Sequence, residues 1–107
     1  DPQERAEYLL SLRDPAALDR HNALSGAFLG EAMELSEEVD SARRGHDQAA
    51  LTALIRRVGE ALATRQSAVD DPAAWAAPDT ARLATLLHEM RVLQRVLRDA
   101  RDTRSPA

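Results

Sequence analysis

Apolar residues recur at the spacing of an α-helix along three long segments of the chain. The clearest stripe repeats every 3.6 residues and consists of Leu51, Leu54, Ile55, Val58, Leu62 and Val69. No segment alternates apolar and polar residues as a half-buried strand does, and no two-residue hairpin signal occurs. Because only 3% of the 107 residues are aromatic, the core must consist mainly of Ala, Leu, Val, Ile and Met, which helices accommodate. The sequence therefore predicts an all-α fold.

The first helix is predicted over about 2–12. Asp1 is placed as its N-cap and Pro2 as its first residue, where a missing N–H costs nothing. The next proline, Pro15, disfavours helix at the residue before it and ends the run. The side chains expected to pack inward are Tyr8, Leu9 and Leu12.

Caps divide the rest of the chain into three long helices. Gly45 is a suitable C-cap, while Asp47 and Asp79 are suitable N-caps. The expected helices cover about 24–44, 47–69 and 79–102, with a loop over 70–78 and frayed residues at 103–107. We therefore expect a three-helix bundle with a short additional N-terminal helix, all four enclosing one core.

Composition and charge exclude several classes of protein. Without Cys the chain has neither a disulfide framework nor a thiolate metal site. No apolar run approaches the roughly 20 residues of a membrane span, and the first residues resemble no secretory or transit signal. A net charge of −4 argues against nonspecific binding of nucleic acid, which needs a basic face. Basic residues that are all Arg, together with abundant Ala, indicate a G- and C-rich bacterial genome, and we expect a cytoplasmic protein.

Residues that carry metal or catalytic chemistry do not occur at the required spacings. None of the three histidines has a second His at ligand spacing, and Val92 stands where a zinc helix beginning at His88 needs its second His. The acidic residues of the second long helix lack the Glu-x-x-His pairs of a di-iron bundle. We expect no metal, no cofactor and no catalytic residue.

A small helical enzyme remains an alternative, because helical chorismate mutases have about this size and bind a dianionic substrate through Arg. The side chains available for such a pocket are Arg5, Arg56, Arg57, Arg82 and Arg91. Those enzymes also typically use a Lys in the site, and this chain has none. Measurable chorismate turnover would favour this alternative.

The second long helix carries an apolar pair away from its core stripe. At 100° per residue, that stripe consists of Leu24, Phe28, Leu35, Val39 and Ala42. Leu29 and Met33 lie roughly 100–140° from its centre and, being four residues apart, touch each other. Around them lie Gly30, Glu34, Glu37, Asp40 and Ser41. Either the pair widens the core or contacts the last helix, or it is an exposed docking site for a partner with an apolar hollow and a basic rim.

Four blocks of the sequence resemble the HscB family of iron–sulfur J-domain co-chaperones. They are residues 5–12 (RAEYLLSL), 27–40 (AFLGEAMELSEEVD), 54–58 (LIRRV) and 75–83 (WAAPDTARL). The blocks occur in the order of the family, at nearly its spacing, and span almost the whole chain. The resemblance identifies the chain as the family's C-terminal domain.

The resemblance implies a binding module, not an enzyme. In the family, the C-terminal bundle binds the iron–sulfur scaffold protein and delivers it to a DnaK-type chaperone. A J domain with a His-Pro-Asp loop stimulates the ATPase of that chaperone, and no His-Pro-Asp occurs in this chain. We therefore expect the chain to be a domain of a longer protein.

The family's contact residues map onto the face of the second long helix that carries the apolar pair. The implied contact set is Leu29, Gly30, Met33, Glu34, Glu37, Ser41 and, from the last helix, Leu86. Three positions depart from the better-known relatives: Gly30 replaces Met, Ser41 replaces an acidic residue, and Leu86 replaces an aromatic residue and lies near the predicted core stripe. The alternative from a different class is a generic oligomerisation module in which the apolar pair forms a contact between two copies.

Overall fold

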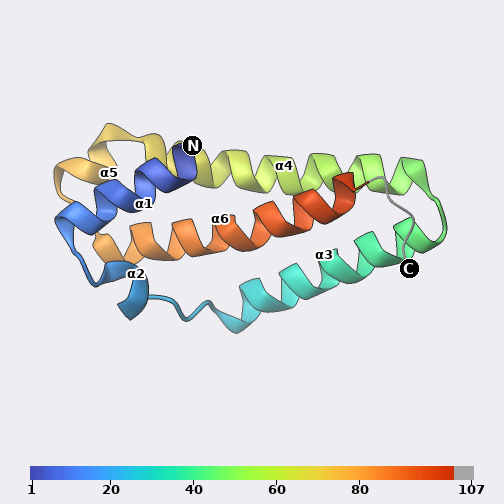
Figure 1. The fold of residues 1–107 in the computed structure, drawn as a ribbon, viewed down its shortest axis with the longest axis horizontal. Coiled ribbons are helices and arrows are strands. Elements are labelled where there is room, and N and C mark those ends of the chain that lie inside the picture. The colour runs from blue at the N-terminus through green and yellow to red at the C-terminus, as the bar shows by residue number, and fades with distance from the viewer. Residues whose placement is uncertain (103–107) are drawn as a thin grey trace.

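Helices account for most of the residues that the structure describes. The computed structural model describes residues 1–102, and in that range it contains helices and no strand (Figure 1). The helices are α1 (Pro2–Arg13), α2 (Ala17–Arg20), α3 (Gly26–Arg44), α4 (Gln48–Asp70), α5 (Pro72–Ala76) and α6 (Thr80–Arg101). The all-α prediction is confirmed, and the expectation about residues 103–107 lies outside the described part.

Aspartate side chains cap the N-termini of three helices, as the sequence indicates. The Asp47 carboxylate accepts a hydrogen bond from the backbone N–H of Ala50, and the Asp79 carboxylate accepts one from the N–H of Arg82, both at 3.0 Å. At the first helix, Asp1 accepts from the N–H of Gln3 at 2.8 Å. These side chains satisfy N–H groups that a helix start leaves without partners.

Two short helices were not predicted, and one of them lies in a segment that was expected to be a loop. In the stretch 70–78, Asp71 caps α5 by accepting from the N–H of Ala73, and Pro72 is its first residue. The same Asp–Pro pair occurs at the N-terminus of α1, so the start of α5 could have been predicted from the sequence. The other is α2, which follows Pro15, and its Ala17 is completely buried.

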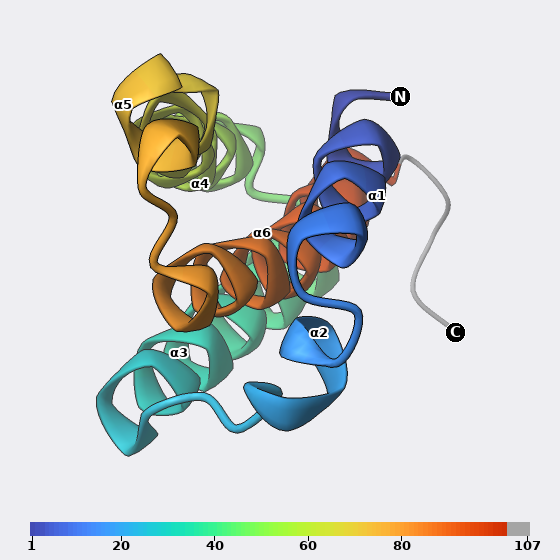
Figure 2. The ribbon, with the colours of Figure 1, turned by 90° about the vertical axis from the view of Figure 1, so that its left-hand side faces the viewer.

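Helix α6 occupies the centre of the molecule, with the other helices around it (Figure 2). Helix α4 runs antiparallel to α6, whereas α3 runs in the same direction (Figure 1). Helices α1 and α2 cover the first half of α6, and α3 packs along its second half. The molecule is elongated, with extents of 47 × 23 × 21 Å.

The apolar interior has two parts, which are joined by Leu62 of α4. One cluster joins α3, α4 and the second half of α6 through residues such as Val39, Val58 and Val96. The other joins α1, α2 and the end of α4 to the first half of α6, with Leu10 and Leu87 at its centre. The division follows from the shape: different helices cover the two halves of one long central helix.

The inward face of α1 differs from the expectation. Tyr8, Leu9 and Leu12 are exposed, at 63%, 43% and 62%, while Gln3, Ala6 and Leu10 are the buried residues. Gln3 can be buried because its amide group donates to the backbone carbonyl of Leu87 at 3.1 Å and accepts from Gln94 at 3.2 Å. Hydrogen bonding, not hydrophobicity alone, sets the rotation of α1.

No helix in the part of the chain that the structure describes is long and apolar enough to cross a lipid bilayer.

Candidate protein-binding face

The rotation of α3 is fixed by its buried side. Ser25 caps the helix by accepting from the N–H of Phe28 at 3.1 Å. Phe28, Ala32 and Val39 then point into the bundle, together with Ala42. Arg65 of α4 holds this side in place, since its guanidinium lies 5.4 Å from the centre of the Phe28 ring.

Leu29 and Met33 are exposed on α3. Each follows a buried residue by one position, which turns its side chain about 100° away from the core. The exposed fractions are 44% for Leu29 and 64% for Met33. The interpretation in which this pair widens the core is therefore wrong, and the pair forms an apolar patch at the surface.

The remaining α3 positions of the implied contact set are also exposed. Together with the apolar pair they span an arc of about 140° at 100° per residue, and we call this surface the outward face of α3. It consists of Leu29, Gly30, Met33, Glu34, Glu37 and Ser41, every one of them exposed. A Cβ atom placed on Gly30 would meet nothing within 4 Å, so the fold does not require glycine there.

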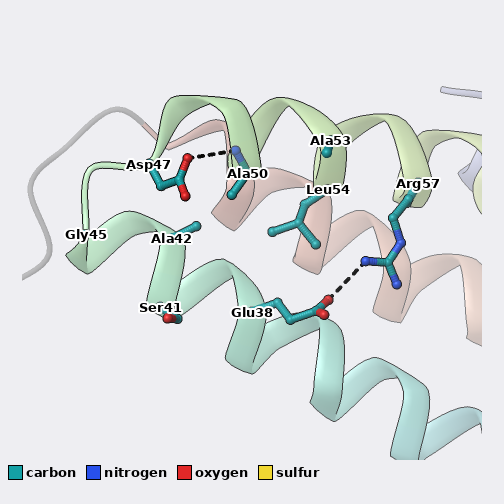
Figure 3. A pocket seen from close by; sticks show the side chains of 9 residues that line it. All are labelled: Glu38, Ser41, Ala42, Gly45, Asp47, Ala50, Ala53, Leu54 and Arg57. Carbon is teal, nitrogen blue, oxygen red and sulfur yellow. Dashed lines mark hydrogen bonds and ion pairs between the residues drawn. The ribbon is translucent and has the colours of Figure 1, made fainter.

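A hollow borders this face on the side of α4. It lies at the turn between α3 and α4, has a volume of about 570 Å³ and includes Ser41 in its lining (Figure 3). Above it, Arg57 of α4 donates to the Glu38 carboxylate at 3.2 Å. Glu38 lies outside the outward face, whose two acidic residues, Glu34 and Glu37, are both exposed.

A groove borders the outward face on the side of α6. It has a volume of about 550 Å³, and Leu29, Met33 and Glu37 line it together with residues of α6. The α6 residues are Arg91, Val92, Arg95 and Val96. Sequence reasoning assigned none of these four to the partner surface, because the pairing of α3 with α6 depends on the tertiary structure.

Leu86 is not part of this surface. It is half-buried and packs on the cluster that contains Leu10, Val69 and Leu87. Because Val92 of the groove is six residues further along α6, the two side chains point about 120° apart around the helix. The implied contact set therefore comes together on α3, whereas Leu86 is half-buried against the other cluster and does not line the groove.

The groove is tied to α1 through an ion pair. Arg91 donates from Nε to the Glu7 carboxylate at 3.0 Å and from Nη2 to its other oxygen. Burial by itself raises the pKa of Glu7, but the hydrogen bonds from Arg91 and Gln3 and the positive charge of Arg91 outweigh it, so the pKa lies below its ordinary value. The same hydrogen bond raises the pKa of Arg91.

Three of the five arginines named for an enzyme pocket do not share a cavity. Arg5, Arg57 and Arg91 border three different cavities. Within residues 1–102, no group of three His, Cys, Asp or Glu side chains is arranged to hold a metal ion.

Comparison with protein families gives one match over most of the chain. Residues 24–101 match the family described as the HSCB C-terminal oligomerisation domain. The chain belongs to this family. The match begins just before α3, so it includes the whole outward face, whereas α1 and α2 precede it. No solved structure matches the chain.

Membership in the HscB family implies a role as an iron–sulfur co-chaperone. This co-chaperone family is not a catalytic one, which agrees with the expectation of a binding module.

Proposed function

We propose that the outward face of α3 binds the iron–sulfur cluster scaffold protein, and that this HscB-family domain presents the scaffold to a DnaK-type chaperone. The observation that carries the proposal is the exposure of Leu29 and Met33 on successive turns of one helix. Large apolar side chains that adjoin each other at a surface are typical of sites that a partner covers. Met adds to this because its unbranched side chain adapts to an irregular partner surface.

The charges around the patch support a partner with a basic rim. Glu34 and Glu37 are exposed on the outward face, and neither carboxylate makes an ion pair within residues 1–102. Such rim charges steer the encounter and set the register of the complex more than they add affinity. Basic residues on the scaffold would meet them.

The rest of the proposal follows from the family. A J domain, where the full protein carries one, would stimulate the ATPase of the chaperone, while the domain described here holds the scaffold. We expect the protein to act in the bacterial cytoplasm during cluster assembly and transfer, without a nucleic-acid or membrane partner.

Isothermal titration with the cognate scaffold protein tests the proposal. The variant is Leu29→Ala combined with Met33→Ala. Covering both side chains is worth about 2–4 kcal/mol, so the double variant should bind roughly 30-fold or more weakly. Circular dichroism should show unchanged helix content, because neither side chain belongs to the core.

Helix α1 provides a matched control. Leu9 and Leu12 are exposed at 43% and 62%, almost the same as Leu29 and Met33. Leu9→Ala combined with Leu12→Ala removes a similar apolar area from a different surface and should leave the affinity unchanged. Equal affinity for both double variants and the wild type would show that the patch assignment is wrong.

Self-association is the second candidate, and the family's description as an oligomerisation domain favours it. In that case the apolar pair would be buried between two copies. A standard interface buries about 800 Å² on each partner, more than two side chains provide, so further contacts would be required. Light scattering distinguishes the candidates: a dimer that the Leu29 and Met33 double variant dissociates would favour self-association.

A further inference from the structure

The groove between α3 and α6 has an apolar base. Among its lining residues, Ala32 of α3 and Val92 and Val96 of α6 are buried or half-buried and form this base, while Leu29 and Met33 are exposed at its edge. Its lining extends from residue 29 to residue 40 on α3, which corresponds to about 16 Å, or three helical turns. The groove therefore has the length of a short helix.

The two edges of the groove carry opposite charges that do not neutralise each other. Glu37 and Asp40 lie on the α3 edge, and Arg95 lies on the α6 edge. Within residues 1–102, the side chains of these three residues make no hydrogen bond or ion pair. Arg91, the other basic residue of the groove, is already held by Glu7. An occupant would thus meet two open carboxylates on one side and one open guanidinium on the other.

We propose that this groove binds one amphipathic helix of about three turns from the scaffold partner. An apolar stripe of that helix lies on the apolar base, basic residues face Glu37 and Asp40, and an acidic residue faces Arg95. The inference rests on the proposed function and deepens it, because it makes Arg95 a specificity-determining residue outside the outward face of α3.

Backbone chemistry favours a helix over an extended segment. Both walls of the groove are helix interiors, whose backbone N–H and C=O groups are bonded within their own helices. An extended segment would find no backbone partners there, whereas a helix satisfies its own backbone. The groove also offers apolar contact to side chains spaced three and four residues apart.

Charge argues against a second copy of this chain as the occupant. The apolar surface that a second copy would insert is its own Leu29 and Met33 on α3. Between residues 26 and 42 that helix carries only acidic charges. Inserting it would bring carboxylates against Glu37 and Asp40, which is unfavourable.

Titration calorimetry with the cognate scaffold protein, on the full chain, tests the inference. The variants are Arg95→Glu, the milder Arg95→Gln, and a control, Arg56→Glu, which makes the same charge change at an exposed position of α4. Arg95→Glu should weaken binding about tenfold and Arg95→Gln about threefold, because an acidic group of the partner loses its counter-charge. Arg56→Glu should match the wild type.

A cross-link identifies the occupant. A benzophenone amino acid at Ser36, which lines the groove, should cross-link to a helical scaffold segment that contains an acidic residue. A cross-link to an extended segment, or to a second copy, would overturn the inference.

The two proposals fail in different ways. If the Leu29 and Met33 double variant loses binding while Arg95→Glu binds like Arg56→Glu, the inference is wrong and the proposed function stands. If neither change weakens binding, the proposed function itself is wrong, and the inference falls with it.

Discussion

Individual residues decide how α1 is attached to the bundle. Gln3 is only 3% exposed, yet it is polar, and its amide is satisfied by Leu87, Glu7 and Gln94. Beside it, the Glu7 carboxylate takes two hydrogen bonds from Arg91. A polar network of this kind positions α1 on α6, where hydrophobic periodicity predicted Tyr8 and Leu12 to do so.

The Glu7–Arg91 pair predicts that stability depends on pH in the acid range. The pKa of Glu7 is lower in the folded protein than its ordinary value of 4.5. Its contribution is therefore fully present above that value and is lost as the pH falls through the lower folded pKa. Glu7→Gln should cost about 0.5–1 kcal/mol at pH 7, and the difference from wild type should shrink as the pH is lowered below 4.5.

Urea unfolding at several pH values checks this prediction. Glu60→Gln is the control, because Glu60 is exposed on α4 and its carboxylate makes no ion pair within residues 1–102. It should unfold like the wild type at each pH. A difference for Glu7→Gln that stays the same from pH 7 to pH 3 would contradict the assignment.

At the scale of elements, the turn between α3 and α4 has its left-handed residue one position after the glycine. Gly45 is the C-cap, but its φ is −83°, and the left-handed residue is His46, with φ of 51°. The N–H of Asp47 donates to the carbonyl of Ala42 at 2.8 Å, and the N–H of His46 donates to that of Arg43 at 3.2 Å. This is the Schellman pattern, in which glycine is usually the left-handed residue.

His46→Gly should therefore stabilise the domain. A left-handed backbone costs a residue with a Cβ about 1–2 kcal/mol, and the greater freedom of glycine in the unfolded chain offsets part of this gain. We expect a net increase of about 0.5–1 kcal/mol in the free energy of unfolding, measured by urea denaturation.

His46→Ala is the control for this substitution. Ala carries a Cβ and pays the same backbone cost, so it should not be stabilising. Equal stability of the Gly and Ala variants would indicate that the backbone at position 46 is not strained.

At the scale of the whole molecule, the packing of the central helix depends on α1 and α2, which precede the family match. Leu10 of α1 and Ala17 of α2 are fully buried against α6, although residues 1–23 lie outside the matched range. The same helices cover Leu87 and Met90, which are 0% and 2% exposed. The matched part alone would therefore leave the first half of the central helix open to water.

A chain that begins at Leu24 should be much less stable than the full chain. Exposing these side chains should cost on the order of 3–6 kcal/mol, which is a large part of the stability of a domain of this size. The urea midpoint should fall and binding of the dye ANS should rise, because apolar surface becomes accessible. An unchanged midpoint would show that the second cluster contributes little.

Sequence alone determined the helical architecture of this domain, because apolar spacing and capping residues are local signals. It also placed Leu29 and Met33 away from the core stripe of α3, since the angle between residues of one helix is fixed by the geometry of that helix, but it left open whether the pair widens the core or is exposed. Tertiary structure alone decided which helices meet. It exposed the apolar pair beside Arg95 and Val92, left Leu86 half-buried and turned Tyr8 outward, because each position depends on contacts between segments that are distant in the chain.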